Sequence, residues 1–349
     1  MNLEERIDAF VQLGKFLSGI SEESPAFMGK ELEKLKSKIE ECEIRNNWFT
    51  EDSINNSLLS LSNQLSSDNF NAWITPYNLS NSGEGKRVLL VMAGNIPLVG
   101  FHDFLSVIVS GNKAVVKLSS NDNILFPYLW EVLCKINPNF SNKLEYIENL
   151  KEKKFDAVIA TGSDNSSKYF EYYFKNIRRI IRKNRRSVAV LNGKETDKEM
   201  KGLASDIFLY FGLGCRNVSK VCLPKGYNLD KLFEVFFPFQ DIVNHKKYGN
   251  NYDYNKSIFL MGNNKLVENG FLLMKEDESL QSPVSMLFYE FYDDLEKVKD
   301  YIDKNADLLQ CVVSKEDIVK KNTHFGETQK PQLWDYADNV DTIEFLSSL

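Results

Sequence analysis

The chain has 349 residues, of which 43% are hydrophobic and 26% are charged, and its formal net charge is -6. This composition is ordinary for a soluble globular protein, and the length allows about two domains, each with its own core. The negative charge argues against nonspecific binding of nucleic acid over the whole surface. No apolar run approaches the ~18 residues of a membrane span and no signal-peptide pattern opens the sequence, so we expect a cytoplasmic protein.

The sequence contains five cysteines, which are Cys42, Cys134, Cys215, Cys222 and Cys311. They form no CxxC pair and their number is odd, which favours a reducing compartment over a disulfide framework or a zinc site. The histidines lie far apart along the chain, so their spacing predicts no metal centre.

Residues 1–68 carry apolar side chains at helical spacing and predict two or three amphipathic helices on the outside of a domain. The next segment predicts alternating strands and helices, as in a doubly wound α/β sheet. The predicted strands are residues 87–93, 114–118, 155–160 and 188–191, and the predicted helices are residues 98–110, 121–136 and 166–183.

Polar residues follow each predicted strand of this sheet. They are Asn95, then Lys117 with Ser119, then Gly162 with Ser163, and finally Asn192 with Gly193. Ligands of such sheets bind at the carboxyl ends of the strands, and the amides of Gly162 and Ser163 could face a phosphate. The plain structural alternatives are a turn residue for Asn95 and a solvated strand end for Lys117. The sequence contains no GxGxxG motif.

A cysteine lies between the end of a predicted apolar helix, residues 204–211, and a predicted strand, residues 218–223. Gly212 and Gly214 precede Cys215 and allow a tight turn there. The backbone on both sides would fix such a thiol, and the thiol could still face a cleft. This arrangement suits a catalytic nucleophile. The alternative is a buried small hydrophobe, the usual fate of free cysteine.

The sequence predicts an N-terminal and nucleotide-binding domain at residues 1–194, a smaller α/β catalytic domain at residues 195–325, and a C-terminal tail at residues 326–349. In the second domain, the predicted helices are residues 227–239 and 295–306, and the predicted strands are residues 257–261, 270–274, 286–292 and 308–313. Residues 250–255 are predicted as a polar loop.

About residues 85–345 resemble the aldehyde dehydrogenase superfamily and, within it, the acyl-CoA reductases of the LuxC type. Four segments carry the resemblance in the order of the family: Gly94-Asn95-Ile96-Pro97, Gly111-Asn112-Lys113-Ala114-Val115-Val116-Lys117, Thr161-Gly162-Ser163 and Gly212-Leu213-Gly214-Cys215. Each segment is weak alone, but four in order are specific. The resemblance implies an aldehyde dehydrogenase-like α/β fold.

The resemblance also implies a role for each segment. Cys215 would accept the acyl group, and Asn95 with the backbone N–H of Cys215 would form the oxyanion hole. Independently of the resemblance, His245 beside a basic loop of the second domain is a candidate proton donor to the reduced intermediate, because histidine titrates near neutral pH. The residues that would bind the nicotinamide cofactor are Lys117, Ser119, Ser120, Gly162, Ser163, Asn192 and Gly193.

The sequence departs from the family's pattern at informative positions. Val190 stands where hydrolytic members carry an acid that activates water, which favours reduction of the acyl-enzyme over its hydrolysis. Ser120 stands where NAD-preferring members often carry an acid, and a neutral residue near Lys117 leaves room for the 2′-phosphate of NADPH. The basic residues 178–186 are predicted to end a helix, either as solvated charges or as a phosphate clamp.

The leading hypothesis is an NADPH-dependent oxidoreductase of fatty acid metabolism that reduces an acyl-CoA or acyl-protein thioester to the aldehyde through a thioester intermediate on Cys215. An ordinary NAD(P)-dependent aldehyde dehydrogenase and a non-reducing acyl-binding or acyl-relay protein are the alternatives. We expect no nucleic-acid partner and no membrane span. A dedicated acyl-donor protein and a homo-oligomer both stay open.

Overall fold

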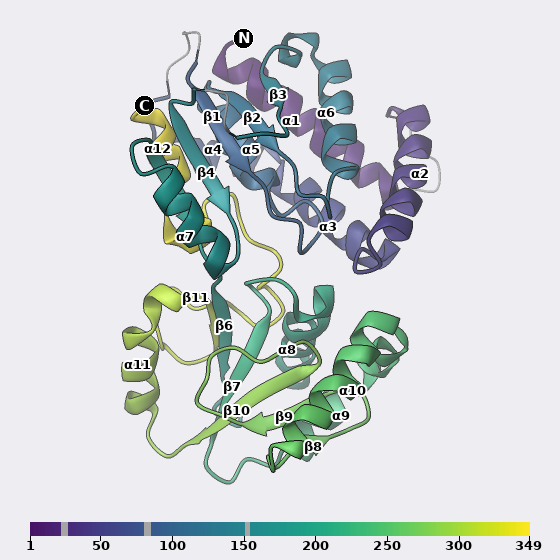
Figure 1. Cartoon of the computed structure of the whole chain (residues 1–349), viewed down its shortest axis with the longest axis vertical. Helices are drawn as coiled ribbons and strands as arrows, with labels where there is room; N and C mark the ends of the chain where they lie inside the picture. Colours follow the sequence, from purple (N-terminus) through teal and green to yellow (C-terminus); the bar gives the residue numbers. More distant parts are fainter. Residues whose placement is uncertain (22–26, 80–84, 151–153) are drawn as a thin grey trace. The chain divides into compact units, whose positions relative to one another are not determined.

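The computed structural model describes residues 1–21, 27–79, 85–150 and 154–349. They form two units, residues 1–183 with 331–349 and residues 184–330. Each unit is built around one sheet (Figure 1). Within the described ranges, no helix combines the length and the apolar character needed to cross a membrane.

The first unit has a parallel sheet with the strand order β3-β2-β1-β4-β5. Its strands are β1 (Arg87–Val91), β2 (Lys113–Lys117), β3 (Leu144–Tyr146), β4 (Ala157–Thr161) and β5 (Arg178–Arg182). Its helices are α1 (Leu3–Ser18), α2 (Gly29–Arg45), α3 (Glu51–Gln64), α4 (Ser67–Ile74), α5 (Phe101–Val109), α6 (Leu125–Ile136), α7 (Asp164–Tyr173) and α12 (Thr342–Ser347). The strand order reverses between β1 and β4, the place where doubly wound sheets bind ligands.

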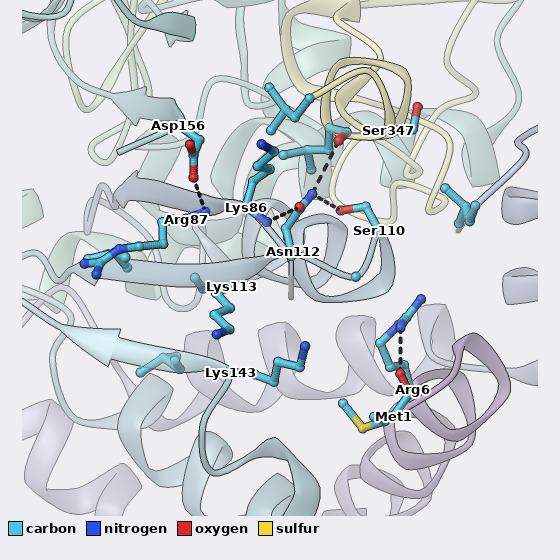
Figure 2. Close-up of a pocket in the computed structure, with 18 of the residues that line it drawn as sticks. Met1, Arg6, Lys86, Arg87, Ser110, Asn112, Lys113, Lys143, Asp156 and Ser347 are labelled. Carbon is cyan, nitrogen blue, oxygen red and sulfur yellow. Dashed lines mark hydrogen bonds between the residues drawn. The ribbon is translucent and has the colours of Figure 1, made fainter. Parts of the chain in front are cut away.

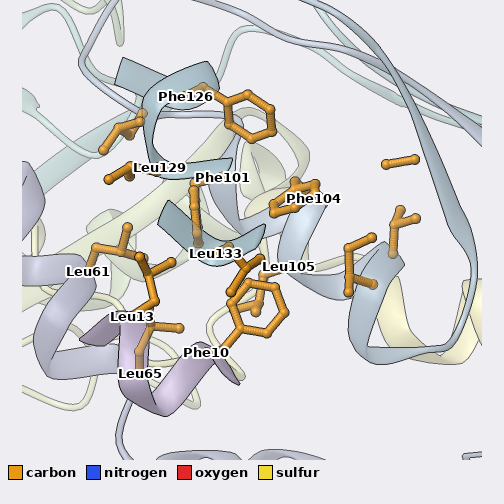
Figure 3. Packing of buried hydrophobic residues seen from close by; sticks show 14 of the residues in the cluster. Phe10, Leu13, Leu61, Leu65, Phe101, Phe104, Leu105, Phe126, Leu129 and Leu133 are labelled. Atoms are coloured by element: carbon orange, nitrogen blue, oxygen red, sulfur yellow. The ribbon is translucent and has the colours of Figure 1, made fainter. Parts of the chain in front are cut away.

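Alternation along the strands explains the layers of this unit. Val88 and Leu90 of β1 pack with α1 to α6 and α12 on one face, whereas Leu89 packs on the other face, which α7 covers. Aromatic rings fill the first face, where Phe104 meets Phe126 edge-on with 4.9 Å between ring centroids (Figure 3). The continuous apolar run of β1 is thus buried on both faces, as parallel sheets require.

Residues 331–349 belong to the first unit and are not a separate tail. The hydroxyl of Tyr336 accepts a hydrogen bond from Trp73 Nε1 at 2.7 Å and lies 2.9 Å from the hydroxyl of Tyr77. Arg182 at the end of β5 donates to Thr342 Oγ1 at 2.9 Å. The unit boundary therefore lies after residue 330 and not before residue 326.

The second unit has a sheet with the order β11-β6-β7-β10-β9-β8, parallel except for the antiparallel pair β8 and β9. Its strands are β6 (Arg186–Val190), β7 (Val218–Pro224), β8 (Val267–Glu268), β9 (Leu273–Glu276), β10 (Met286–Tyr292) and β11 (Leu309–Ser314). Its α-helices are α8 (Asp197–Phe208), α9 (Asp230–Phe236), α10 (Lys246–Met261) and α11 (Leu295–Lys304), and the 3₁₀-helices η3 (Leu209–Gly212) and η4 (Phe237–Asn244) follow α8 and α9. Helices α8 and α9 pack on one face of the sheet and α11 on the other.

The boundary between the units differs from the prediction because β6 belongs to the second sheet. The sequence placed this strand fourth in the first sheet, but it pairs with β7 and β11. Only residues 183–185 connect β5 to β6. Because a parallel pair needs a crossover of roughly a dozen residues or more, β6 cannot join the sheet beside β5. The second unit therefore begins at residue 184 and not at residue 195.

Residues 178–182 form β5 and not the end of a helix. Ile180 and Arg182 are buried at alternate positions, as the period of a strand requires. The guanidinium of Arg182 binds both carboxylate oxygens of Asp103, at 2.6 and 3.1 Å. The basic residues here are therefore divided between the two faces of a strand, and Arg182 has a structural partner.

Residues 250–255, predicted as a polar loop, and residues 257–261, predicted as a strand, both belong to the single helix α10. Tyr248, Tyr252 and Asn255 are its buried residues, and their spacing of four and three places them on one helical face. Tertiary burial of this face outweighs the weak helix propensity of the asparagines in the segment.

Buried contacts hold the loop after β1, residues 92–98. Leu98 has a left-handed backbone with φ of 58°, and its N–H donates to Asp122 Oδ2 at 2.8 Å. Asp122 Oδ1 is buried and has no hydrogen-bond partner among the described residues. Burial raises the pKa of Asp122 to about 6. A Cβ on Gly94 would lie 2.5 Å from Ser119 Oγ, so the loop rests directly on the turn after β2.

Replacing Asp122 by Asn should stabilise the protein increasingly as the pH rises from about 4 to about 7. The folded-state pKa of about 6 exceeds the value of ~3.9 for an unfolded aspartate, so the wild type loses stability through this window. The full loss is on the order of 3 kcal/mol. An amide avoids it and still accepts the N–H of Leu98.

The measurement is urea unfolding of wild type and Asp122→Asn at about pH 4.5 and about pH 7.5. Exposed Asp68→Asn is the control and should show the same difference from wild type at both values. A stability difference for Asp122→Asn that does not grow with pH would contradict the charge state inferred for this carboxyl group.

Candidate active site

Cys215 lies half-buried on a strained turn between α8 and β7. The preceding residues Tyr210, Phe211 and Gly212 all have left-handed backbones, with φ of 54°, 58° and 74°. For Tyr210 and Phe211 this conformation costs roughly 1–2 kcal/mol each, because Cβ crowds the following carbonyl oxygen. Such strain persists only where surrounding contacts fix it, and it concentrates at functional sites.

Asn217 makes several of the contacts that hold this turn in place. Its side chain, 3% exposed, accepts the N–H of Gly214 at 2.9 Å. Its Nδ2 donates to the carbonyl oxygens of Asp206, Ile207 and Leu209 at 3.1, 3.3 and 2.7 Å. These carbonyls end α8, where no further helical turn satisfies them. One amide therefore joins the end of α8 to the residue before the cysteine, a role that the sequence analysis missed.

The cysteine backbone is also fixed to the start of β6, because the Ser187 hydroxyl donates to the carbonyl oxygen of Cys215 at 2.9 Å. The other cysteines are less suited to react. Burial raises the pKa of Cys42 to about 12 and that of Cys222 to about 11, and it also raises the pKa of Cys134. A thiol held protonated is a poor nucleophile. Position and exposure therefore favour Cys215.

His245 lies in the same unit as Cys215 and next to its turn. The imidazole packs against the ring of Phe211, with 4.4 Å between centroids. Its Nδ1 accepts the backbone N–H of Tyr248 at 3.4 Å and caps α10. In the neutral imidazole the proton is then on Nε2, which leaves that nitrogen as the donor. The position suits the predicted proton donor, although helix capping alone also accounts for this histidine.

A small cavity of about 30 Å³ adjoins the cysteine turn within the second unit. Phe211 and Gly212 line it from the turn, Tyr248 lines it from α10, and residues 282–286 line it from the segment before β10. Ser285 in that segment is buried and has φ of 65°. A second strained segment thus lies beside the cysteine turn.

In the first unit, the predicted cofactor residues gather at one edge of the sheet. Asn95 follows β1, Lys117 ends β2, and Gly162 follows β4. These strands are neighbours in the order β2-β1-β4 and run parallel, so their carboxyl ends meet at the same edge. Ser119 and Ser120 lie on the turn after β2, on which the Asn95 loop rests. Asn95 and Ser120 are exposed there.

The amide groups at the end of β4 are used differently from the prediction. The N–H of Gly162 donates to the carbonyl oxygen of Arg182 at 3.3 Å, which continues the pairing with β5. The hydroxyl of Ser163 caps α7 by accepting the N–H of Ser166 at 3.4 Å. The Gly162 amide is therefore occupied and cannot face a phosphate in this conformation.

Asn192 and Gly193 lie in the second unit and not at this edge. Their N–H groups donate to the carboxylate of Glu195 at 2.6 and 3.1 Å. They follow the carboxyl end of β6, whereas Cys215 lies by its start. The five residues of β6 span about 16 Å, so these two residues lie far from the cysteine along the strand.

Val190 does not stand in for a catalytic acid. It is 1% exposed and packs in a cluster with Cys222 and Val298 of α11. An acid at this position would be buried among apolar side chains, at the end of β6 remote from Cys215. The preference for reduction over hydrolysis that the sequence analysis drew from Val190 stays a prediction.

Solved structures of aldehyde dehydrogenases share this fold. Aldehyde dehydrogenase 21 from Physcomitrella patens, in complex with succinate, matches with a TM-score of 0.64 and 13% identity over 90% of this chain and 74% of that chain. A Mycobacterium tuberculosis aldehyde dehydrogenase complexed with NAD+ matches with a TM-score of 0.62 and 12% identity over 90% and 73%. The substrate-bound AldH of Staphylococcus aureus matches with a TM-score of 0.56 and 15% identity over 91% and 77%. These matches confirm the predicted aldehyde dehydrogenase-like α/β fold.

None of the curated proteins compared with the chain matches it significantly. A family model described as acyl-CoA reductase (LuxC), however, matches residues 28–229, more than half of the chain. The match includes Asn95, Lys117 and Cys215, and it confirms the resemblance seen in the sequence. The chain is an enzyme that belongs to the LuxC family of acyl-CoA reductases.

Proposed function

We propose that this reductase uses NADPH and forms a thioester with its substrate's acyl group on Cys215 before it releases the aldehyde. The placement of Cys215 carries the proposal, because a half-buried thiol follows a strained turn that Asn217 fixes. Hydrogen bonds with Asn217 and Ser187 fix the backbone on which both the thiol and the backbone N–H of Cys215 are carried. A nucleophile and an oxyanion donor both need that preorganisation.

In the proposed reaction, the Cys215 thiolate attacks the carbonyl carbon of an acyl-CoA or acyl-protein thioester. The carbon–sulfur bond of the substrate breaks and its thiolate leaves with the electron pair. NADPH, when bound, supplies a hydride to the resulting acyl carbon. His245 would protonate the oxygen of the reduced adduct, and loss of that proton then expels the Cys215 thiolate and frees the aldehyde. Asn95 and the N–H of Cys215 would stabilise the charged oxygen.

The carboxyl edge of the first sheet has residues that fit a phosphorylated cofactor. Lys117 is partly exposed there, and Ser120 beside it is exposed and neutral. The acid of the same turn, Asp122, is buried and turned toward Leu98. A cation without an exposed acid in its own turn suits a 2′-phosphate.

The remaining cofactor contacts belong to the same proposal. Ser119, Gly162 and Ser163 would contribute from the first sheet edge, Gly162 through close packing and not through its amide. Asn192 and Gly193 would contribute from the second unit. Relatives of the same fold that carry NAD+ support a nicotinamide cofactor.

The direct test mixes the protein with a series of acyl-CoAs and NADPH, follows the loss of NADPH absorbance and traps the aldehyde. A reductase consumes one NADPH for each aldehyde formed. An ordinary aldehyde dehydrogenase would instead oxidise added aldehyde to acid, and an acyl-relay protein would leave NADPH fluorescence unchanged.

Replacing Cys215 by Ala should abolish both turnover and the covalent acyl adduct, because the thiol is the acceptor. Intact-mass measurement after incubation with acyl-CoA, without NADPH, shows the adduct directly. Cys134→Ala, which alters the other partly exposed cysteine, should keep both. An acyl adduct on the Cys215→Ala protein would assign the nucleophile to another residue.

Ser120→Glu should shift the cofactor preference from NADPH toward NADH, because it places a carboxylate beside the 2′-phosphate. Loss of the charge-assisted contact with Lys117 corresponds to roughly a tenfold to hundredfold weaker NADPH affinity. Fluorescence titration with both cofactors measures the ratio, and Ser141→Glu on the exposed surface of the same unit is the control. A wild type that binds both cofactors equally, with no change in Ser120→Glu, would refute the assignment.

Asn217→Ala should lower kcat while NADPH affinity stays near the wild-type value, because it loosens the turn of Cys215 and not the first sheet. Loss of hydrogen bonds from buried carbonyls should also destabilise the second unit by about 1–3 kcal/mol. Asn305→Ala is the matched control, since it removes a single bond to the carbonyl oxygen of Tyr301. It should change stability without changing kcat.

The rate at which iodoacetamide alkylates Cys215 separates positioning from general destabilisation. Asn217→Ala should change this rate under conditions where the protein stays folded, and Asn305→Ala should not. Equal alkylation rates and equal kcat in both variants would reduce Asn217 to a structural residue.

A further inference from the structure

A row of lysines lies at the amino edge of the first sheet, opposite the edge assigned to the cofactor. Lys86 directly precedes β1, Lys113 begins β2, and Lys143 directly precedes β3. The N–H of Lys113 donates to the carbonyl oxygen of Lys86 at 2.8 Å, and the N–H of Ala114 donates to that of Lys143 at 2.9 Å. The register pairs Lys113 with Arg87, so the side chain of Lys86 points to the opposite face of the sheet from that of Lys113. Lys113 and Lys143 begin neighbouring strands that lie about 4.8 Å apart, which places their charges side by side.

These lysines line a cavity of about 1070 Å³ that lies wholly within the first unit (Figure 2). Figure 2 shows Lys113 and Lys143 reaching into the space between β2 and α1, with Arg6 of α1 on its far side. Burial, together with the charges of Arg6 and Lys113, lowers the pKa of Lys143. The three cations are therefore close enough to repel one another.

The acids of this cavity are already engaged elsewhere. Glu145 pairs with Arg87 at 3.0 Å, and the carboxylate of Asp156 accepts the backbone N–H of Arg87 at 2.8 Å. Among the described residues, no ion pair is formed by Lys86 or Lys113. The cavity thus holds an excess of positive charge that its own carboxylates do not neutralise.

Arg6 is the strongest sign that an anion is missing from this arrangement. Its side chain is 2% exposed, and Nη1 donates to the carbonyl oxygen of Met1 at 3.0 Å. Its Nε and Nη2 are buried and have no hydrogen-bond partner among the described residues. Burial lowers the pKa of Arg6. A buried guanidinium with unmet donors is costly, and an anion that accepts from these donors would offset that cost.

We propose that this cavity is a second ligand site, which binds a small molecule carrying two or more phosphate groups on a nucleotide-sized body. The volume accommodates a ligand of that size, since ligand pockets span roughly 300–1000 Å³. The planar fork of Arg6 suits two phosphate oxygens, and Lys113 and Lys143 supply point charges near it. Adenosine phosphates, whether free nucleotides or the nucleotide part of CoA, have this chemistry.

The site is separate from the one assigned to the cofactor. Lys113 begins β2 and Lys117 ends it, so the length of the strand separates the two edges. A strand of five residues spans about 16 Å. A ligand at the amino edge therefore leaves the carboxyl edge open, and the two can be occupied together.

The test uses thermal unfolding and calorimetry of the whole chain with pyrophosphate, ATP and desulfo-CoA as separate probes. Wild type should gain several degrees in Tm from at least one probe, with an effect that weakens as salt rises. Lys143→Met should weaken the affinity about 10- to 100-fold, which is the effect of one charge-assisted contact. The probe that binds most tightly shows whether free nucleotides or CoA are the preferred source of phosphate.

Matched variants locate the binding. Lys36→Met removes an exposed lysine of α2 and should bind like the wild type. Lys117→Met, which alters the cofactor edge, should also keep the probe's effect on Tm. Loss of the effect in Lys117→Met with none in Lys143→Met would place the probe at the cofactor edge and overturn the proposal.

Arg6→Met gives an independent readout that needs no ligand. If Arg6 is kept for an anion, removing its unmet charge should raise Tm of the free protein and also abolish the increase caused by the probe. A purely structural Arg6 predicts the reverse, a lower Tm without ligand and an unchanged response to the probe. That outcome would overturn the proposal.

Discussion

Parallel strand pairing is the constraint on which both units depend. It buries both faces of each sheet and requires helical crossovers between the strands. It also gathers the carboxyl ends of the parallel strands at one edge and their amino ends at the other. In the first unit, Asn95, Lys117 and Gly162 therefore meet at one edge, while Lys86 and Lys113 meet at the opposite one. One sheet thus presents two chemically different edges.

The segments near the candidate sites are held by single buried polar side chains and not by regular structure. Asp122 holds the loop of Asn95, and Asn217 holds the turn of Cys215. Asp206 at the end of α8, 1% exposed, accepts the N–H of Gly326 at 2.7 Å and also binds Thr328. Burial raises the pKa of Asp206 to about 6. Burial of each of these side chains costs hydration free energy, but its hydrogen bonds hold the neighbouring backbone in one conformation. Such a loss of stability is common near functional sites.

The sequence predicted the elements that local patterns specify. The apolar runs of β1, β2, β4 and β10 and the glycine-flanked turn of Cys215 were all predicted at nearly the observed residues. The basic strand β5 was missed, because two of its three arginines are exposed and only packing shows which face is buried. Helix α10 was missed because tertiary burial, and not propensity, selects it.

The candidate sites likewise contain some residues that sequence motifs reveal and others that only the structure reveals. Motifs located Cys215 and Asn95, but the roles of Asn217 and Asp122 depend on backbone atoms of other segments, which no short pattern reveals. The sequence placed Asn192 at the edge of the first sheet because it placed β6 in that sheet, whereas β6 belongs to the second sheet. The second unit begins at residue 184 and not at the predicted residue 195, and this shift of 11 residues places Asn192 in the second unit.

The return of residues 331–349 to the first unit makes the second unit an insertion within the first. During synthesis from the N-terminus, all of residues 184–330 emerge before the segment that supplies Tyr336 and α12. Until then, Trp73 lacks its hydrogen-bond partner Tyr336, and the apolar surface against which Ile343 and Leu346 pack stays uncovered. The inserted unit can complete its own core, including the turn of Cys215, while the first unit still lacks Tyr336 and α12. The unfinished first unit is therefore the one exposed to misassembly and chaperone binding.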